Sequence, residues 1–244
     1  ANLEVIDDDE LLVREATLLL SIVPPGVALD VATRFLGPLT SAAVKPAFVE
    51  CNAISPATAR AIADSLAPSG CAFIDGGIIG GPPTQDLSGK GPRIYVSGPD
   101  AHLMTPLRNY GLDILVVDGP VGAASALKMS YAGLTKGLIA LGAAMIMGAS
   151  HDGVDSALRA ELARSQPELL SMLARRIPAG FPKAHRWVAE MEQIAEFLGD
   201  PANGSTIYSG AAGLYRRLAA EWNQGETVGG PGIIAAFCRR AVGR

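Results

Sequence analysis

Two lysines interrupt an otherwise apolar stretch at residues 119–150, and they are the first side chains here that could do acid–base chemistry. A helix places residues three and four apart on the same face, so Lys128, Tyr131 and Thr135 share one face and Lys136 lies beside it. A lysine held away from water can transfer a proton or bind an anion, and a tyrosine phenol can donate a proton. The alternative is that the lysine amines reach solvent along their stems and that Tyr131 serves packing.

The stretch that carries these residues is predicted to be one long helix, because it is rich in alanine, leucine and methionine and has no proline after Pro120. Small residues on nearly every face indicate that other segments approach closely and that the helix is buried all round. It would span roughly 40 Å, so it should leave one domain and form the core of another. The uncharged run after Lys136 is shorter than the about 20 residues that a bilayer requires, which predicts that it is not a membrane span.

Strand-like and helix-like segments alternate before this helix, whereas only helix-like segments follow it. The expected strands are residues 16–23, 46–51, 71–75, 93–97 and 113–117. The expected helices are residues 27–36, 55–66 and 99–110, and then 156–163, 167–176, 183–198, 206–223 and 232–242. The pattern predicts an α/β domain with a mostly parallel sheet over residues 1–118. An all-α domain is predicted over residues 119–244.

Three consecutive predicted strands end in segments suited to ligand binding, at residues 23–25, 50–56 and 75–81. In an open α/β sheet, ligands bind beyond the carboxyl ends of the strands. The glycine pairs of the third segment would let a ligand approach the backbone and would offer N–H groups to an anion. Each segment alone reads as a tight turn, but three in succession, followed by an apolar helix with Lys128, form a more specific pattern.

The composition argues against several classes of function. The formal net charge of −4 and the lack of a basic run give no support for nucleic-acid binding. Cys51, Cys71 and Cys238 have no C-x-x-C spacing, and the three histidines form no H-E-x-x-H pair, so neither a disulfide framework nor a metal site is expected. Acidic residues at positions 7–10 occupy the place of a signal-peptide core, which predicts a cytoplasmic protein.

The order of motifs resembles that of the β-hydroxyacid dehydrogenases, the relatives of 6-phosphogluconate dehydrogenase. Successive strands lead into VPP at residues 23–25, ISP at residues 54–56 and DGxxxGG at residues 75–81, and the long helix carries GxxxxxKM. The segment HRWVAEMEQIA is similar to that of a subgroup with a C-terminal domain of unknown function. The resemblance covers nearly the whole chain. It implies that residues 1–118 are a partial Rossmann-type dinucleotide-binding domain, and that residues 119–244 form an all-helical domain, reached through a linking helix, for substrate binding and dimerisation. It also implies a homodimer and oxidation of a hydroxy acid, or reduction of its carbonyl, with NAD or NADP.

The resemblance also implies which residues hold the cofactor. Val23 and Pro24 match the loop that runs along the cofactor ribose. Asn52 and Ala53 match the turn near the nicotinamide. The choice between NAD and NADP stays open, because the residue that decides it follows a strand that this sequence does not contain.

For the substrate, Lys128 matches the family's catalytic lysine, which transfers the proton of the substrate hydroxyl. Gly80 and Gly81 match the segment that grips the substrate carboxylate. Tyr131 stands where the phosphogluconate enzymes have histidine, and Thr135 where they have an acidic residue, so 6-phosphogluconate itself is not the expected substrate. Tyr131 shares the face of Lys128 and is a second candidate for the acid.

Other positions depart from the family pattern. The asparagine usually found four residues after the lysine is Ala132, and the serine usually found before the double glycine is Ile79. The sequence has no G-x-G-x-x-G motif, which would hold a pyrophosphate, and it lacks the family's first two strands, expected at the centre of the sheet. We expect the 244 residues to be the remainder of a longer chain. The alternative is a short form that has lost dinucleotide binding.

The sequence therefore predicts an NAD(P)-dependent oxidoreductase that acts on a small hydroxy acid or on the corresponding carbonyl or imine compound. Lys128 and Tyr131 are its candidate catalytic residues. A homodimer is expected, without a nucleic-acid or membrane partner. The rival interpretation is a non-catalytic dimeric binding or scaffold protein that keeps the fold without its cofactor, and Ala132 and Ile79 favour it.

Overall fold

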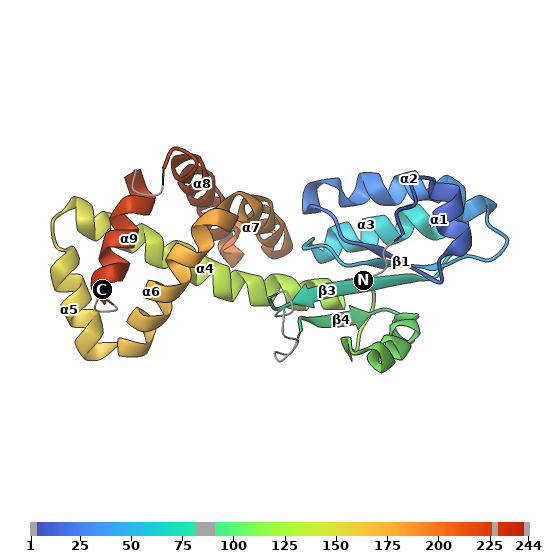
Figure 1. Cartoon of the computed structure of the whole chain (residues 1–244), viewed down its shortest axis with the longest axis horizontal. Helices are drawn as coiled ribbons and strands as arrows, with labels where there is room; N and C mark the ends of the chain where they lie inside the picture. Colours follow the sequence, from blue (N-terminus) through green and yellow to red (C-terminus); the bar gives the residue numbers. More distant parts are fainter. Residues whose placement is uncertain (1–3, 82–90, 226–228, 242–244) are drawn as a thin grey trace. The chain divides into compact units, whose positions relative to one another are not determined.

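The computed structural model describes residues 4–81, 91–225 and 229–241. Its chain divides into two compact units, Ala1–Ser130 and Tyr131–Arg244. Helix α4 (Ala123–His151) runs through the division, and each unit is otherwise built from its own elements (Figure 1). The assignment of residues 1–118 and 119–244 to separately folding domains remains a prediction.

The first unit is built on a five-stranded sheet with the order β1-β2-β3-β4-β5. The strands are β1 (Leu18–Ser21), β2 (Ala47–Glu50), β3 (Phe73–Ile79), β4 (Arg93–Ser97) and β5 (Asp113–Val116). All neighbours are parallel except β3 and β4, which are antiparallel. The mostly parallel sheet is thus confirmed, and its one antiparallel step needs no helical crossover.

One detail of the predicted sheet is wrong. The third strand does not end at Asp75 but continues through Gly76 and Gly77 to Ile79, because its pairing with β4 extends over these residues. The five described strands pair in chain order, so β1 and β5 are the two edge strands of the described sheet, and further strands could be added beside either. The expected place of the family's first two strands, at the centre of a complete sheet, stays a prediction.

One face of this sheet is covered by α1 (Asp9–Glu15), α2 (Ala28–Ser41) and α3 (Pro56–Leu66). Each helix presents apolar residues at helical spacing to Phe48 and its neighbours on the strands. The start of α3 is fixed as predicted, because the Ser55 hydroxyl accepts the amide N–H of Thr58 at 3.0 Å and a proline follows at the first helical position.

The opposite face of the sheet is covered by a 3-10 helix, Ala101–Tyr110, whose Met104 is fully buried against Val49 and Ile94. A helix was expected here over residues 99–110. Pro106 lies inside this segment and cannot donate a backbone hydrogen bond, which is consistent with the tighter, irregular helix.

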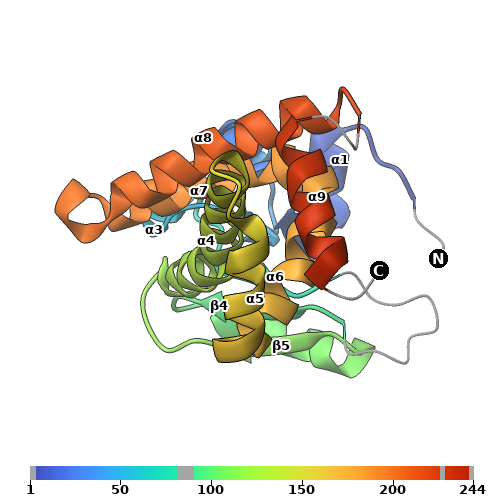
Figure 2. The same cartoon turned by 90° about the vertical axis from the view of Figure 1, so that its left-hand side faces the viewer.

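The second unit is entirely helical in its described part, as predicted. It contains α5 (Asp155–Ser165), α6 (Pro167–Gly180), α7 (Ala184–Leu198), α8 (Ser205–Trp222) and α9 (Gly229–Ala241). Helix α7 packs along α8, and α6 packs against α9 (Figure 2). Trp187 of α7 meets Tyr215 of α8 edge to face, with ring centres 5.1 Å apart.

The small residues of α4 serve close packing in this unit. A Cβ atom on Gly133 or Gly137 would lie 3.0 Å from the Tyr208 ring, and one on Gly142 would overlap Leu173. By length and composition α4 also meets the criteria for a membrane-crossing helix, with a mean hydropathy of 1.5 in a window that is 39% buried. Tyr208 and Leu173 pack against α4, but Leu134, Leu141 and Met145 are exposed, so the prediction that the helix is buried all round is wrong.

Candidate active site

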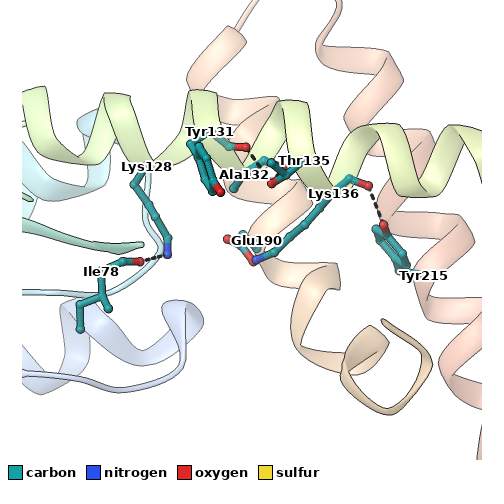
Figure 3. A network of polar contacts seen from close by, with 8 residues as sticks. All are labelled: Ile78, Lys128, Tyr131, Ala132, Thr135, Lys136, Glu190 and Tyr215. Carbon is teal, nitrogen blue, oxygen red and sulfur yellow. Dashed lines mark hydrogen bonds and ion pairs between the residues drawn. The ribbon is translucent and has the colours of Figure 1, made fainter. Parts of the chain in front are cut away.

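Lys128 lies where the first turns of α4 cross β3. A Cβ atom on Gly77 would stand 3.1 Å from the carbonyl oxygen of Ala124 and 3.2 Å from the Cβ of Lys128, so the helix approaches the strand closely because residue 77 is glycine. The half-buried Lys128 side chain then reaches along the strand, and its Nζ donates a hydrogen bond to the carbonyl oxygen of Ile78 (Figure 3). This contact places the amine two residues before Gly80.

Asp75 fixes the start of α4 and therefore the direction of Lys128. Its fully buried carboxylate accepts the amide N–H groups of Gly122 and Ser125, both at 3.0 Å, and the Ser125 hydroxyl at 2.5 Å. The Ser97 hydroxyl donates to the same carboxylate at 2.8 Å and accepts the amide N–H of Ala124 at 2.9 Å. A carboxylate at a helix N-terminus is favoured by the helix dipole. The sequence placed Asp75 at the end of an expected strand and the start of a ligand-binding segment, and this role was not predicted.

The glycine pair expected at the substrate carboxylate follows the end of β3. Gly80 has a φ of +130°, which a residue with a side chain rarely adopts, and a Cβ atom there would lie 3.0 Å from the Cα of Pro92. Both Gly80 and Gly81 are exposed, so their backbone is open to a ligand. Ile79, which replaces the family's serine, is buried and turns no polar group toward this position.

The two loops expected at the cofactor are joined by one side chain. Asn52 is buried; its Oδ1 accepts the amide N–H of Val23 at 2.6 Å, and its Nδ2 donates to the Ser21 hydroxyl at 2.9 Å. Ala53 is half-buried, and Pro24 is exposed just before a short 3-10 helix. The structure therefore brings Val23 and Asn52 together, while Pro24 and Ala53 extend the same two loops.

A row of polar residues crosses the sheet beside these loops, and the sequence analysis did not identify it. Ser21, Glu50, Asp75 and Ser97 stand opposite one another on four neighbouring strands, and all four are buried. Burial, with a smaller contribution from the charge of Asp75, raises the pKa of the Glu50 carboxyl to about 7, while interactions with Asn52 and Ser21 act in the opposite direction. The available signal was a polar residue directly after a short apolar run in each of the four strands.

The other candidates on α4 lie beyond Ser130, in the helical unit. Tyr131 is 44% exposed. The Thr135 hydroxyl donates to the carbonyl oxygen of Tyr131 at 2.8 Å, so it is used within its own helix. Lys136 does not reach solvent as a free amine but forms an ion pair with Glu190 of α7 (Figure 3). The part of the chain that the structure describes contains no cluster of three or more histidine, cysteine or acidic residues able to hold a metal ion.

Comparisons with known proteins agree with this architecture. Residues 149–218 match the model of a domain of unknown function, DUF1932. An uncharacterized 28.5 kDa protein encoded in the 7S RNA 5′ region of Methanothermus fervidus is 26% identical over 198 residues, which cover 81% of this chain and 74% of that protein.

Two solved structures show the same fold. One is a conserved protein of unknown function described as structurally similar to 3-hydroxyacid dehydrogenases; it is 25% identical, with a TM-score of 0.65 over 91% of this chain and 82% of that one. The other is the 3-hydroxyisobutyrate dehydrogenase of Mycobacterium tuberculosis with L-serine, 17% identical, with a TM-score of 0.59 over 95% and 82%. The predicted resemblance is thereby confirmed at the level of the fold: this chain has the fold of the 3-hydroxyacid dehydrogenases, and part of its helical unit is similar to DUF1932.

Proposed function

We propose that this protein is an NAD(P)-dependent oxidoreductase of the β-hydroxyacid dehydrogenase type. It acts on a small hydroxy acid or on the corresponding carbonyl or imine compound. The observation that carries the proposal is the contact of the Lys128 amine with the Ile78 carbonyl, just before the exposed backbone of Gly80 and Gly81. In this proposal the amine serves as the general acid or base, and the backbone segment binds the substrate carboxylate.

The loops after β1 and β2 fit one end of a dinucleotide. They follow the carboxyl ends of two adjacent parallel strands, which is where such ligands bind in this class of sheet, and Asn52 holds them together through Val23. Val23, Pro24, Asn52 and Ala53 would hold the ribose and the nicotinamide, and the bound nicotinamide supplies or accepts the hydride. The 244 residues contain no G-x-G-x-x-G cradle, so the described loops account for the nicotinamide end of the ligand.

In this proposal, residues of the chain transfer the proton and bind the substrate. The Lys128 amine takes the proton of the substrate hydroxyl during oxidation and returns it during reduction. The backbone of Gly80 and Gly81 binds the substrate carboxylate. Tyr131, one turn further along α4, serves as a second proton donor, and Thr135 contributes to the substrate pocket.

The test is a kinetic comparison of three proteins. Consumption of NADH and NADPH is followed against a panel of small carbonyl and imine compounds, and the reverse reaction against 3-hydroxy acids. Lys128→Met should lower turnover roughly a hundredfold or more while the Michaelis constant for the cofactor changes little. Lys183→Met, at an exposed lysine of the helical unit, is the matched control and should keep full activity. Full turnover in Lys128→Met would exclude Lys128 as the acid or base.

A second candidate function is a dimeric binding protein without catalysis. The buried apolar side chains of Ile79 and Ala132, where the family carries polar ones, favour it. It predicts that neither nucleotide is consumed with any compound of the panel, although the small molecules still bind to the wild-type protein.

We also propose that the protein is a homodimer, with α4 at its interface. Large exposed apolar residues follow one another along this helix at alternating spacings of three and four: Leu127, Tyr131, Leu134, Leu138, Leu141 and Met145. This spacing gives one continuous seam, which suits the same helix of a second copy. The three cysteines are free thiols, in keeping with a reducing cytoplasm as the proposed location.

A further inference from the structure

Glu50 ends β2 in the centre of the buried polar row, and its surroundings are unusual for a carboxyl group. Ser21 stands opposite it on β1 and Asp75 opposite it on β3. Its Oε1 accepts the amide N–H of Asn52 at 2.8 Å. Its Oε2 is buried and, among the described residues, has no hydrogen-bond partner. A buried oxygen of this kind is costly when the group carries a charge.

The contacts of Glu50 continue into the loop after β1. Glu50 holds the backbone of Asn52, and the Asn52 side chain holds the amide N–H of Val23 at 2.6 Å and the Ser21 hydroxyl at 2.9 Å. The Glu50 carboxyl group therefore holds Asn52 in place, and Asn52 in turn holds the loop after β1 in place. None of these contacts involves Lys128.

We propose that Glu50 is a positioning residue for the two loops that hold the nicotinamide, and that it closes them in its protonated form. The ligand named here rests on the proposed function, whereas the positioning of the loops rests on the contacts of Glu50 and Asn52 alone. Glu50 touches neither the substrate nor the cofactor in this proposal; it acts through Asn52.

The electrostatic surroundings determine the direction of the effect. The charged group that faces Glu50 is Asp75, while Ser21 and Asn52 are uncharged and the buried Cys51 thiol has a pKa raised to about 12. Ionised Glu50 would place a second negative charge beside Asp75 and an unsatisfied oxygen in the interior. Opening the loops gives this carboxylate access to water and lets it lose its proton. Because the closed form keeps the proton up to a higher pH, rising pH favours the open form.

The closing experiment reads the two loops directly and without any ligand. The whole chain is labelled with ¹⁵N at valine and asparagine, and amide spectra and hydrogen exchange are recorded between pH 5.5 and 8.5. In the wild type, the amide signals of Asn52 and Val23 should both show an inflection near pH 7. The protection of the Val23 amide, corrected for the intrinsic exchange rate, should fall at least about tenfold across this range.

Two variants test the cause. Glu50→Gln keeps the size of the side chain and an oxygen that can accept from Asn52, so it should fold, and both inflections and the loss of protection should disappear. Glu168→Gln, the same change at an exposed glutamate of α6, should leave them as in the wild type. If either amide signal of Glu50→Gln still shows the inflection, the proposal is overturned. It is also overturned if the wild type shows an inflection at the Asn52 amide but none at the Val23 amide.

Nucleotide titrations separate this inference from the proposed function. If NADH or NADPH binds, its dissociation constant should rise with pH in the wild type and stay level in Glu50→Gln. If neither nucleotide binds while the amide signals behave as expected, the proposed function fails and the positioning role of Glu50 stands. If binding depends equally on pH in both proteins, Glu50 does not position the cofactor loops.

Discussion

The ammonium group of Lys136 in α4 is ion-paired with the carboxylate of Glu190 in α7. Both side chains are largely shielded from water, with 24% and 6% of their surfaces exposed. The same ammonium lies 5.5 Å from the centre of the Trp187 ring, and the Tyr215 hydroxyl donates to the Lys136 carbonyl oxygen at 2.6 Å. Burial, followed by the nearby charge of Glu190, raises the pKa of Tyr215. These contacts join three helices of the helical unit around one buried pair of charges.

Breaking this pair on one side should destabilise the protein strongly. Lys136→Met leaves the buried Glu190 carboxylate without its partner, which we expect to cost about 3 kcal/mol of unfolding free energy in urea denaturation. The double variant Lys136→Met/Glu190→Leu should recover part of this loss, because it removes both charges. Arg164→Met breaks an exposed pair with Glu161 and should cost less than about 1 kcal/mol. Equal losses for the two single variants would show that burial does not strengthen the Lys136 pair.

The stability of the whole protein should depend on pH through Glu50. Burial raises its pKa from the usual 4.5 to about 7, so the folded state keeps a proton that the unfolded state releases. The resulting stability is complete below about pH 4.5 and is lost as the pH rises to about 7. The melting temperature of Glu50→Gln should therefore fall less than that of the wild type between pH 5 and pH 8. Parallel curves for the two proteins would contradict this assignment.

The crossing of α4 over β3 should tolerate no side chain at position 77. Gly77→Ala places a methyl group 3.1 Å from the backbone of Ala124, and we expect a loss of about 1–3 kcal/mol with a weaker contact between Lys128 and Ile78. Gly37→Ala in α2 meets no atom within 4 Å and should be neutral or slightly stabilising, because alanine favours a helix. Thermal unfolding should show a lower melting temperature for Gly77→Ala and an equal or higher one for Gly37→Ala, relative to the wild type.

The exposed seam of α4 should control assembly. Leu141→Lys introduces a charge into it, and we expect the protein to sediment as a monomer at micromolar concentration where the wild type is a dimer. Ile207→Lys is the matched control, an equally large exposed apolar residue on α8, outside the seam. A monomeric wild type in analytical ultracentrifugation would refute the dimer itself.

The sequence was sufficient to predict the segments whose signal is local. The N-cap at Ser55 and the apolar run of α4 could be recognised from neighbouring residues alone, and the elements found there agree with the prediction. The course of β3 could not be predicted in this way. Gly76 and Gly77 have the composition of a turn, but they lie in a strand because they pair with β4. Glu50, Cys51 and Ala124 approach them too closely for a side chain.

The candidate site shows the same division. Lys128 was identified from its place in a motif, whereas Glu50 was not, because its character depends on neighbours from three strands. Only the register of β1, β2 and β3 brings Ser21, Glu50 and Asp75 side by side. The ion pair of Lys136 could not be predicted from the sequence either, since Glu190 lies 54 positions further along the chain.

The acceptor that holds Lys128 belongs to the main chain of Ile78, and every amino acid carries the same carbonyl group. Replacing the side chain at position 78 therefore keeps the carbonyl oxygen that accepts the hydrogen bond of the amine. The residue at this position can vary in evolution while Lys128 keeps this contact. Selection should act instead on the neighbouring residue, Gly77, because α4 can pack closely against β3 only where residue 77 has no side chain. Distant relatives with this arrangement should therefore have an invariant glycine at the position of Gly77 and a variable residue at the position of Ile78. The glycine would then identify the lysine contact more reliably than the residue whose carbonyl group forms it.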